Sequence, residues 1–406
     1  MHKSSIKHGD DFVNFFTNRF NVGPVCCIMA FRRESGRPVL CRKIEEEQVN
    51  RRLQPGQTDH RVLIVCCSSL IKTQKGGISM AIEKKYDVTA LGELLIDFVQ
   101  NGLSDQGNNL YEANPGGAPC NVLAMLSKAG CKTAFIGKVG NDMFGRMLKE
   151  RAGGEGIDMA GLEMDNDVHT TLAFVEKLPN GDRDFSFYRK PGADIMLTKD
   201  EVEASAALIE GAKIFHLGTL SMTDDEVEKA TKAAMKIAKK AGCIISFDPN
   251  LRPPLWSSEE KAKEKIAWGL EQCDVLKISD NEITLMTGEE DLDKGIKMII
   301  DKYNIPLVFA TYGPDGSKAY FKGIEAFEPG FLNPNTIETT GAGDTFCASA
   351  LYHVLKYGLD GFDEAKLHEL LTFANAAASL VTTKKGALCV MPTVDEVQAY
   401  IKESGR

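Results

Sequence analysis

The sequence predicts an α/β protein whose mostly parallel central sheet is covered by helices on both faces. From Tyr86 onward, short apolar runs alternate with longer amphipathic segments, which is typical of this architecture. The chain has 406 residues, of which 43% are hydrophobic, and this is enough for a sizeable core. No run of about 18 apolar residues occurs, so we expect no membrane-spanning helix.

The first predicted elements form a strand–helix–strand unit. We expect strands at 86–94 and 132–140, because both segments are short and largely apolar. The segment between them, 121–130, has apolar residues at helical spacing and ends at Gly130, a residue that commonly follows a helix.

The same alternation continues to the C-terminus. The segment 225–242 predicts an amphipathic helix that Gly242 ends. The other predicted elements are strands at 243–250, 274–279 and 305–313, followed by long helices at 343–358 and 367–386.

One segment interrupts this pattern and predicts a small β lid. Residues 169–190 are two extended runs joined by Pro-Asn-Gly-Asp, which indicates a hairpin. The segment 97–115 can supply partner strands. A β flap beside an α/β crevice is a common way to keep water from a reaction, although a simple insertion would have the same pattern.

Residues 1–79 differ in composition from the rest of the chain. They contain 13 basic and 7 acidic residues, together with five of the eleven cysteines. We interpret them as an atypical N-terminal extension, either disordered or upstream of a true start at Met80, and residues 80–406 as the catalytic domain. KGGISM (75–80) is compatible with a translated ribosome-binding site before that start. A targeting peptide and a small partner-binding module are the alternatives.

Charge and cysteine content restrict the function further. The net charge of −9 argues against general nucleic-acid binding, which requires a basic surface. The cysteines form no metal-type CxxC pairs, so we expect reduced thiols and a cytoplasmic protein.

The segment IETTGAGDTF (337–346) predicts an anion cradle at the start of a helix. Gly341, Ala342 and Gly343 allow backbone N–H groups to approach an anion, and the helix dipole favours negative charge there. Asp344 at this position could accept the proton of an attacking hydroxyl group. A plain loop with Asp344 as the helix cap is the other interpretation.

A second glycine cluster, NPGGAPCNV (114–122), also lies between extended chain and a helix. Gly116 and Gly117 permit close approach of a polar ligand, and Asn121 can donate and accept hydrogen bonds, as sugar hydroxyls require. Asp97 follows the first strand and could bind a pair of hydroxyls. A tight turn with a helix cap would explain the same residues. The chain has no Walker A motif and no GxGxxG after a strand, which disfavours P-loop enzymes and dinucleotide oxidoreductases.

These segments together resemble the two signatures of the ribokinase-like (PfkB) carbohydrate kinases, and the sequence is most similar to fructokinases. The resemblance extends from Tyr86 to about Pro392 and includes GELLIDF (92–98), FYRKPGAD (187–194), FDPNLRPPLW (247–256) and KISDNE (277–282). It implies a three-layer α/β/α fold with a small β lid, and ATP-dependent phosphorylation of the 6-hydroxyl of D-fructose.

The resemblance also implies roles for individual residues. Asp344 is the expected base, and the backbone of 341–343 is the expected anion hole. The sugar would contact Asp97, Gly117, Asn121 and Arg189, with a lid surface charge as the alternative for Arg189. The nucleotide would lie near Asn250, Arg252, Thr311, Gly313, Gly316 and Asn375.

The metals that the resemblance implies are Mg²⁺ and, in some relatives, K⁺. Glu282 corresponds to the glutamate that arranges Mg²⁺ through water, with helix capping as the alternative, and Ser279 stands where the family usually has asparagine. Glu338 replaces the usual aspartate of DTxGAGD, and with Thr340 it marks a candidate monovalent-cation site.

Two other functions remain open at this point. One is a kinase for another sugar or sugar acid, such as 2-keto-3-deoxygluconate, on the same fold. The other is a non-catalytic, ligand-responsive regulator, which the intact GAGD disfavours. Because many relatives pair through their lids, we expect a homodimer.

Overall fold

The computed structural model describes residues 26–27, 43–44, 72–74, 77–79, 84–177 and 183–406. The chain divides into two compact units, Met1–Ala81 and Ile82–Arg406. In the first unit, β1 (Cys26–Cys27) pairs with β2 (Lys43–Ile44) and β3 (Lys72–Gln74) pairs with β4 (Gly77–Ser79), both antiparallel. The other expectations for residues 1–79, including the translated ribosome-binding site, lie outside the described residues.

The second unit is built on a nine-stranded sheet with the order β17-β16-β15-β14-β13-β12-β5-β8-β9. Only β16 runs opposite to the other strands, antiparallel to both β15 and β17, so the sheet is mostly parallel, as predicted. The strands are β5 (Tyr86–Leu91), β8 (Thr133–Gly140), β9 (Ile157–Asp165), β12 (Ala212–Leu217), β13 (Ile244–Phe247), β14 (Val275–Ser279), β15 (Leu307–Thr311), β16 (Ser317–Phe321) and β17 (Ile324–Glu328).

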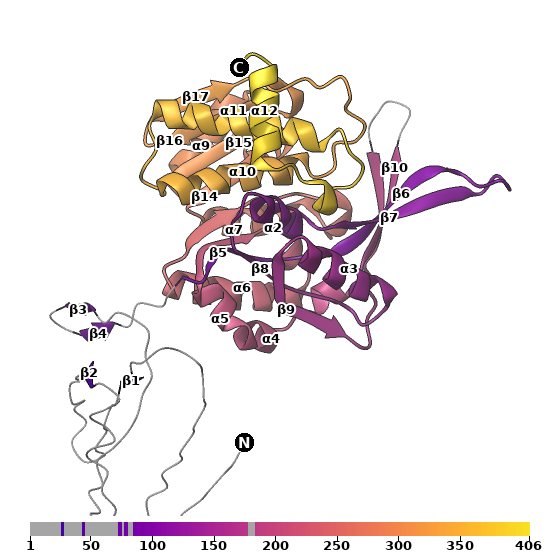
Figure 1. Ribbon diagram of the computed structural model, residues 1–406, viewed down its shortest axis with the longest axis horizontal. Helices are drawn as coiled ribbons and strands as arrows, with labels where there is room; N and C mark the ends of the chain where they lie inside the picture. The colour runs from indigo at the N-terminus through magenta and orange to yellow at the C-terminus, as the bar shows by residue number, and fades with distance from the viewer. Residues whose placement is uncertain (1–25, 28–42, 45–71, 75–76, 80–83, 178–182) are drawn as a thin grey trace, which may run out of the picture. The chain divides into compact units, whose positions relative to one another are not determined.

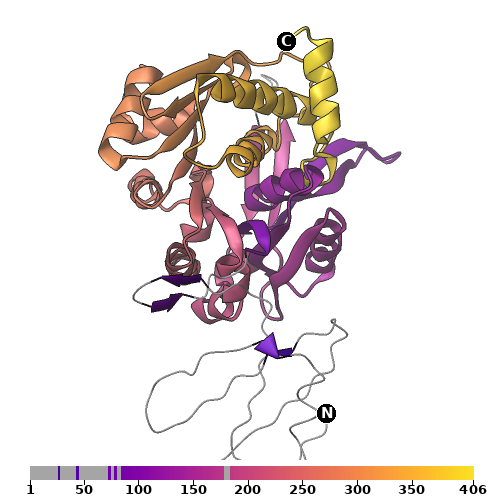
Figure 2. The same ribbon diagram turned by 60° about the vertical axis from the view of Figure 1, so that its left-hand side comes forward.

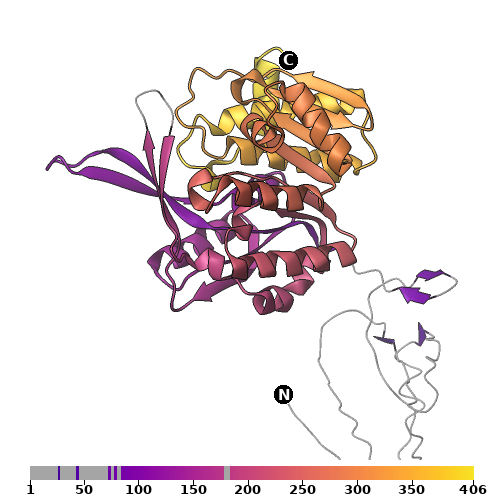
Figure 3. The same ribbon diagram turned by 180° about the vertical axis from the view of Figure 1, so that it is seen from behind.

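Helices cover both faces of this sheet and make it the middle of three layers (Figures 1 and 3). The strands are apolar on both faces; in β15, Phe309 packs into one core while Val308 and Ala310 pack into the other. One core contains α2 (Ala118–Lys128), α3 (Met143–Gly154), α10 (Ala342–Tyr357), α11 (Glu364–Val381) and α12 (Val394–Glu403). The other contains α4 (Lys199–Ala204), α5 (Ala206–Glu210), α6 (Asp225–Lys240), α7 (Glu259–Leu270), α8 (Asp280–Thr287) and α9 (Leu292–Tyr303). Figure 2 shows the same layers turned by 60°.

A separate four-stranded sheet forms the predicted lid and projects from the body of the second unit (Figures 1 and 3). Its order is β11-β10-β6-β7, from β6 (Leu95–Leu103), β7 (Asn109–Gly116), β10 (Leu172–Lys177) and β11 (Arg183–Tyr188). Only residues 92–94 separate β5 of the main sheet from β6 of the lid. Strand β11 contacts the 3-10 turn η3 (Pro253–Leu255), which follows strand β13 of the main sheet.

The predicted elements are confirmed to within a few residues at most ends, but the last long helix is shorter than expected. We predicted a helix over 367–386, whereas α11 ends at Val381. The reason lies in Thr382: its hydroxyl donates to the Ser379 carbonyl oxygen, and its own carbonyl oxygen accepts from the backbone N–H groups of Ile337 and Glu338. The Thr382 carbonyl oxygen is thus bound by residues outside the helix, and residues 382–384 make tighter i→i−3 backbone bonds instead of continuing α11. No helix in the described part of the chain is both long and apolar enough to cross a bilayer.

Candidate active site

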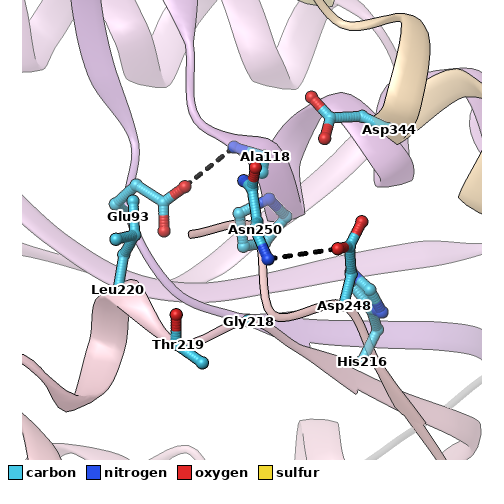
Figure 4. A pocket seen from close by; sticks show the side chains of 10 residues that line it. Glu93, Ala118, His216, Gly218, Thr219, Leu220, Asp248, Asn250 and Asp344 are labelled. Atoms are coloured by element: carbon cyan, nitrogen blue, oxygen red, sulfur yellow. Dashed lines mark hydrogen bonds between the residues drawn. The ribbon is translucent and has the colours of Figure 1, made fainter. Parts of the chain in front are cut away.

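Polar residues follow several parallel strands at their carboxyl ends and line one pocket there. Gly218 follows β12 and Asp248 follows β13, so both lie at the edge where ligands usually bind in such sheets. The space between atoms in this pocket is about 240 Å³, part of which is open to solvent. Its walls are Glu93, Ala118, Pro119, His216, Gly218, Thr219, Leu220, Asp248, Asn250 and Asp344 (Figure 4).

The anion cradle predicted at 341–343 is a tight turn at the N-terminus of α10. Gly341 is the residue before the helix and has φ 78°, a left-handed conformation that side chains disfavour. A Cβ there would also lie 2.6 Å from the Cβ of Ala387. Glycine is therefore required at this position. The helix starts at Ala342, so its first N–H groups and its dipole favour a bound anion.

Asp344 lies in the first turn of α10 and faces the pocket (Figure 4). Its Oδ2 accepts a 2.8 Å hydrogen bond from the side-chain amide of Asn121, on α2. Burial raises the pKa of Asp344, while Asn121, Lys277 and Arg252 oppose that rise. The carboxylate is thus a stronger base than an exposed aspartate.

Asn121 is held at the site by the turn before α2. Gly117 begins that helix with φ 123°, and a Cβ on it would collide with the Glu93 carbonyl oxygen. The Glu93 side chain also accepts from the backbone N–H of Ala118 at 2.8 Å. Asn121 itself is 3% exposed, and its Oδ1 has no hydrogen-bond partner among the described residues. A buried oxygen without a partner points to a bound ligand or water.

The lid contributes Asp97, which lies on β6 directly opposite Asn114 of β7 and beside Ala173 of β10. Gly116 leaves room for it, because a Cβ on Gly116 would collide with the Asp97 carboxylate. Gly117 therefore allows the tight turn before α2, and Gly116 allows the Asp97 side chain to approach the backbone.

Arg189 is buried rather than exposed on the lid surface. Its guanidinium pairs with Asp194 at 2.6 Å and donates to the Leu220 carbonyl oxygen at 2.7 Å and to the Thr223 hydroxyl at 3.0 Å. The pKa of Arg189 is raised, because the carboxylates of Asp194 and Glu93 outweigh the effect of burial. These contacts show Arg189 joining the lid end to the pocket wall.

The phosphate side of the predicted site is formed by the turn after β13. Asn250 has φ 46° and its backbone N–H donates to the Asp248 carboxylate at 3.2 Å (Figure 4). The Lys277 ammonium lies 3.1 Å from the same carboxylate. Arg252 is half-buried, and its charge acts on Asp344.

Glu282 caps the start of α8. One carboxylate oxygen accepts from the Ser279 backbone N–H and the other from the Leu251 backbone N–H, each at 2.8 Å. Glu282 therefore does cap the helix, which was the alternative to a role with Mg²⁺. Its bond to Leu251 also joins α8 to the turn that contains Asn250 and Arg252. Within the described residues, no group of three histidine, cysteine or acidic side chains could hold a metal ion.

The residues predicted to line the nucleotide pocket come together at the end of β15. Thr311 pairs in register with Ser317, and Gly313 and Gly316 flank the 3-10 turn η4 (Gly313–Asp315) between them. The Ser317 hydroxyl donates to the Asn375 side chain at 2.9 Å. The amide of Asn375 donates in turn to the Glu328 carbonyl oxygen, so this side chain also anchors β17.

Glu338 and Thr340 precede the 341–343 turn, in a segment without regular secondary structure. Glu338 is 3% exposed, and its Oε2 has no hydrogen-bond partner among the described residues. A buried carboxylate oxygen of this kind is costly unless a cation or water satisfies it. The geometry therefore fits a cation beside the turn.

Sequence reasoning missed four polar residues around the pocket: Glu93, His216, Asp248 and Lys277. Burial raises the pKa of Glu93 to about 7 and lowers the pKa of His216 to about 3. Burial, with Glu282 and Asp344 nearby, raises the pKa of Asp248 to about 7 despite Lys277. Glu93, Asp248 and Lys277 lie within predicted strands, where a polar residue in an apolar run is the available signal. His216 lies in β12, a strand that was not predicted.

Comparison with known proteins gives concordant results. The profile of the pfkB family carbohydrate kinases matches residues 85–394. Fructokinase-2 of Oryza sativa subsp. japonica is 39% identical over 331 residues, which cover 81% of this chain and 98% of that protein.

Solved structures agree with the fold. Fructokinase from Xylella fastidiosa with bound ATP superposes with a TM-score of 0.71 at 30% identity, covering 79% of this chain and 99% of that one. A double mutant of fructokinase from Vibrio cholerae O395, with fructose, ADP and a potassium ion bound, has a TM-score of 0.69 at 28% identity, covering 79% and 99%. The ribokinase-like three-layer fold predicted from the sequence is therefore confirmed.

Proposed function

Because the chain belongs to the pfkB family of carbohydrate kinases and is an ATP-dependent sugar kinase, we propose that its acceptor is the 6-hydroxyl of D-fructose. The observation that carries this proposal is Asp344, which faces the pocket beside the 341–343 turn and is held by Asn121. The choice of fructose as the sugar is supported by the relatives, since the rice protein is named a fructokinase and the Vibrio structure contains fructose.

In the proposed mechanism, Asp344 is the general base. The sugar hydroxyl lies against its carboxylate, gives up its proton to it and attacks the γ-phosphoryl group in line. Asn121 orients the carboxylate through its amide, and its buried Oδ1 accepts from a sugar hydroxyl. Asp97 at the lid and the backbone of Gly116 and Gly117 bind the other hydroxyls.

The 341–343 turn is the proposed anion hole for the transferred group. Its N–H groups and the α10 dipole act where negative charge develops, in a site from which water is excluded. Asn250 and Arg252 approach the phosphates from the opposite side, while Thr311, Gly313, Gly316 and Asn375 bound the nucleotide.

We propose Mg²⁺ as the metal that accompanies ATP, where it neutralises charge on the phosphates when bound. Glu282 would act on it through water, for which each of its oxygens keeps an acceptor site beside the one that accepts a backbone N–H. A monovalent cation, K⁺, would lie at Glu338 and Thr340, and the orphan Oε2 of Glu338 supports this site. The potassium ion in the Vibrio structure supports the choice of ion.

Three further proposals concern the whole chain. Residues 80–406 would suffice for catalysis, as the family match to 85–394 and the compact unit Ile82–Arg406 suggest. The lid would pair two copies into a homodimer, supported by the exposed apolar side chains of Leu103, Leu110, Tyr111 and Tyr188. The six cysteines in 84–177 and 183–406 are all free, which supports a cytosolic location.

The testing experiment is a coupled ADP-release assay of the full chain and of residues 80–406. The panel contains fructose, ribose, glucose, tagatose and 2-keto-3-deoxygluconate. We expect fructose to have the highest kcat/KM by at least tenfold with both proteins. A higher value for another sugar would refute the substrate, and activity of the full chain alone would refute the dispensability of the extension.

A further inference from the structure

Lys277 is a buried cation on β14, inside the sheet that supports the site. It is 7% exposed, and its ammonium lies 3.1 and 3.3 Å from the two oxygens of the Asp248 carboxylate. A buried ion pair is seldom a net gain in stability, because removing two charges from water costs as much as their attraction returns. The pair therefore requires another explanation.

The position of Lys277 beside the 341–343 turn provides an explanation for this ion pair. The Lys277 ammonium lies 3.3 Å from the point that a Cβ on Gly343 would occupy, so it touches the turn formed by residues 341–343 from within the protein. Its charge also lowers the pKa of Asp344. Lys277 thus acts on both sides of the reaction centre, the base and the anion hole.

The charge balance around the pocket points the same way. Asp248, Glu282 and Asp344 place three carboxyl groups around the site; the charges of Glu282 and Asp344 raise the pKa of Asp248, and the three groups together repel an incoming anion. Lys277 and Arg252 are the cations whose charges act on Asp344. Although burial disfavours the charged form, Asp248 and Glu282 raise the pKa of Lys277, so its ammonium stays charged at neutral pH.

We propose that Lys277 is a further catalytic residue, whose ammonium, held by Asp248, stabilises the negative charge of the phosphoryl group at the 341–343 turn. The proposal rests on the kinase function above. The phosphoryl group leaves ADP and bonds to the sugar oxygen, and the hydroxyl proton passes to Asp344. Lys277 neither gains nor loses a proton; its contribution is a fixed positive charge in a water-poor site.

A double-mutant cycle separates this role from simple neutralisation of Asp248. It compares the unmodified full-length chain, Lys277→Met, Asp248→Asn and the double variant. We expect Lys277→Met to lower kcat about 100-fold in both the unmodified and the Asp248→Asn backgrounds, as loss of a transition-state charge contact does. If the loss shrinks to less than about threefold in the Asp248→Asn background, Lys277 only offsets Asp248 and the proposal is wrong.

Thermal unfolding of each variant shows whether it is folded, and the comparison within the Asp248→Asn background decides even if Lys277→Met alone does not fold. A second measurement needs no turnover. Tetrafluoroaluminate imitates the transferring phosphoryl group when it is added to protein that already holds Mg·ADP and sugar. This addition should raise the unfolding temperature of Asp248→Asn further, but not that of the double variant. Equal increases in both would overturn the proposal.

The assay uses whichever sugar the unmodified chain phosphorylates, so a wrong assignment of fructose leaves the test of Lys277 intact. If the unmodified chain phosphorylates no sugar in the panel, the kinase function and the role of Lys277 are both refuted. A Lys277→Arg variant keeps the charge and should retain more kcat than Lys277→Met.

Discussion

Asn121 and Asp344, 223 positions apart in the sequence, are joined by a 2.8 Å hydrogen bond between the side-chain amide of one and the carboxylate of the other. This contact connects the two glycine-rich helix starts, because Asn121 lies on α2 and Asp344 on α10. The proposed sugar-binding cluster and the proposed base are thus parts of one site.

Asp344→Asn should abolish turnover while leaving ATP affinity within a few-fold of the unmodified protein. The substitution keeps the shape of the side chain but removes the group that accepts the hydroxyl proton, so kcat should fall by about 10³-fold or more. Steady-state kinetics measures kcat, and titration calorimetry measures the affinity for ATP. A purified variant with more than a tenth of the normal kcat would refute the role of Asp344.

Asn121→Ala should move the acid limb of the kcat/KM profile to higher pH. Asp344 acts as a base only when ionised, and activity falls as pH drops through its pKa. The Asn121 amide stabilises the ionised form, so its removal raises that pKa further and moves the acid limb to higher pH.

The matched control is Ser127→Ala, near the other end of the same helix and outside the residues that line the pocket. Its acid limb should stay in place. If Asn121→Ala lowers kcat/KM at every pH without moving the acid limb, then Asn121 binds substrate but does not change the pKa of Asp344.

Glu338→Gln should weaken the dependence of activity on K⁺. The orphan Oε2 of Glu338 would lose its charge, while the buried volume stays nearly the same. We expect KCl to activate the unmodified protein more than NaCl or tetramethylammonium chloride at equal ionic strength, and this difference to shrink at least fivefold in the variant. Equal rates in all three salts for the unmodified protein would contradict a specific cation site.

Glu93→Gln should change how stability depends on pH. The folded state raises the pKa of Glu93 from 4.5 to about 7, so it binds this proton more tightly than the unfolded chain does. The free energy of unfolding therefore loses a contribution as pH rises from about 4.5 to about 7. Glutamine keeps an acceptor for Ala118 and carries no charge.

Urea unfolding at pH 5 and pH 8 measures the effect. The variant should be more stable than the unmodified protein at pH 8 by about 1 kcal/mol or more, and the gap should narrow at pH 5. If the gap is the same at both pH values, the carboxyl group of Glu93 does not titrate in this range.

Much of the fold was predictable because the signals are local. Alternating apolar runs located β5, β8, β13, β14 and β15 of the main sheet, although β9, β12, β16 and β17 were not predicted. Glycines after helices located helix ends, as at Gly130 and Gly242. The turn at Gly341 was predictable for the same reason, since a left-handed residue before a helix is a property of neighbouring residues. The end of α11 was not, because Thr382 is held by residues 337 and 338, which lie far away in the sequence.

Most contacts between side chains could not be predicted from the sequence. Periodicity shows that Lys277 stands in an apolar strand, but not that Asp248 and Gly343 are its neighbours. Arg189 was expected to contact the sugar or to lie on the lid surface, and the structure shows a buried residue bound to Asp194 and Leu220. Such contacts depend on how strands are ordered in the sheet, which composition does not reveal.

The contact between lid strand β11 and the turn η3 joins the sugar side of the molecule to the phosphate side. In the proposed mechanism, closure of the lid over a sugar shifts the segment that carries Asn250 and Arg252, and binding of nucleotide acts on the lid in return. Thermodynamic linkage requires these effects to be equal: whatever factor fructose adds to the affinity for nucleotide, nucleotide adds to the affinity for fructose. The proposed mechanism therefore predicts heterotropic cooperativity between the two substrates within a single chain.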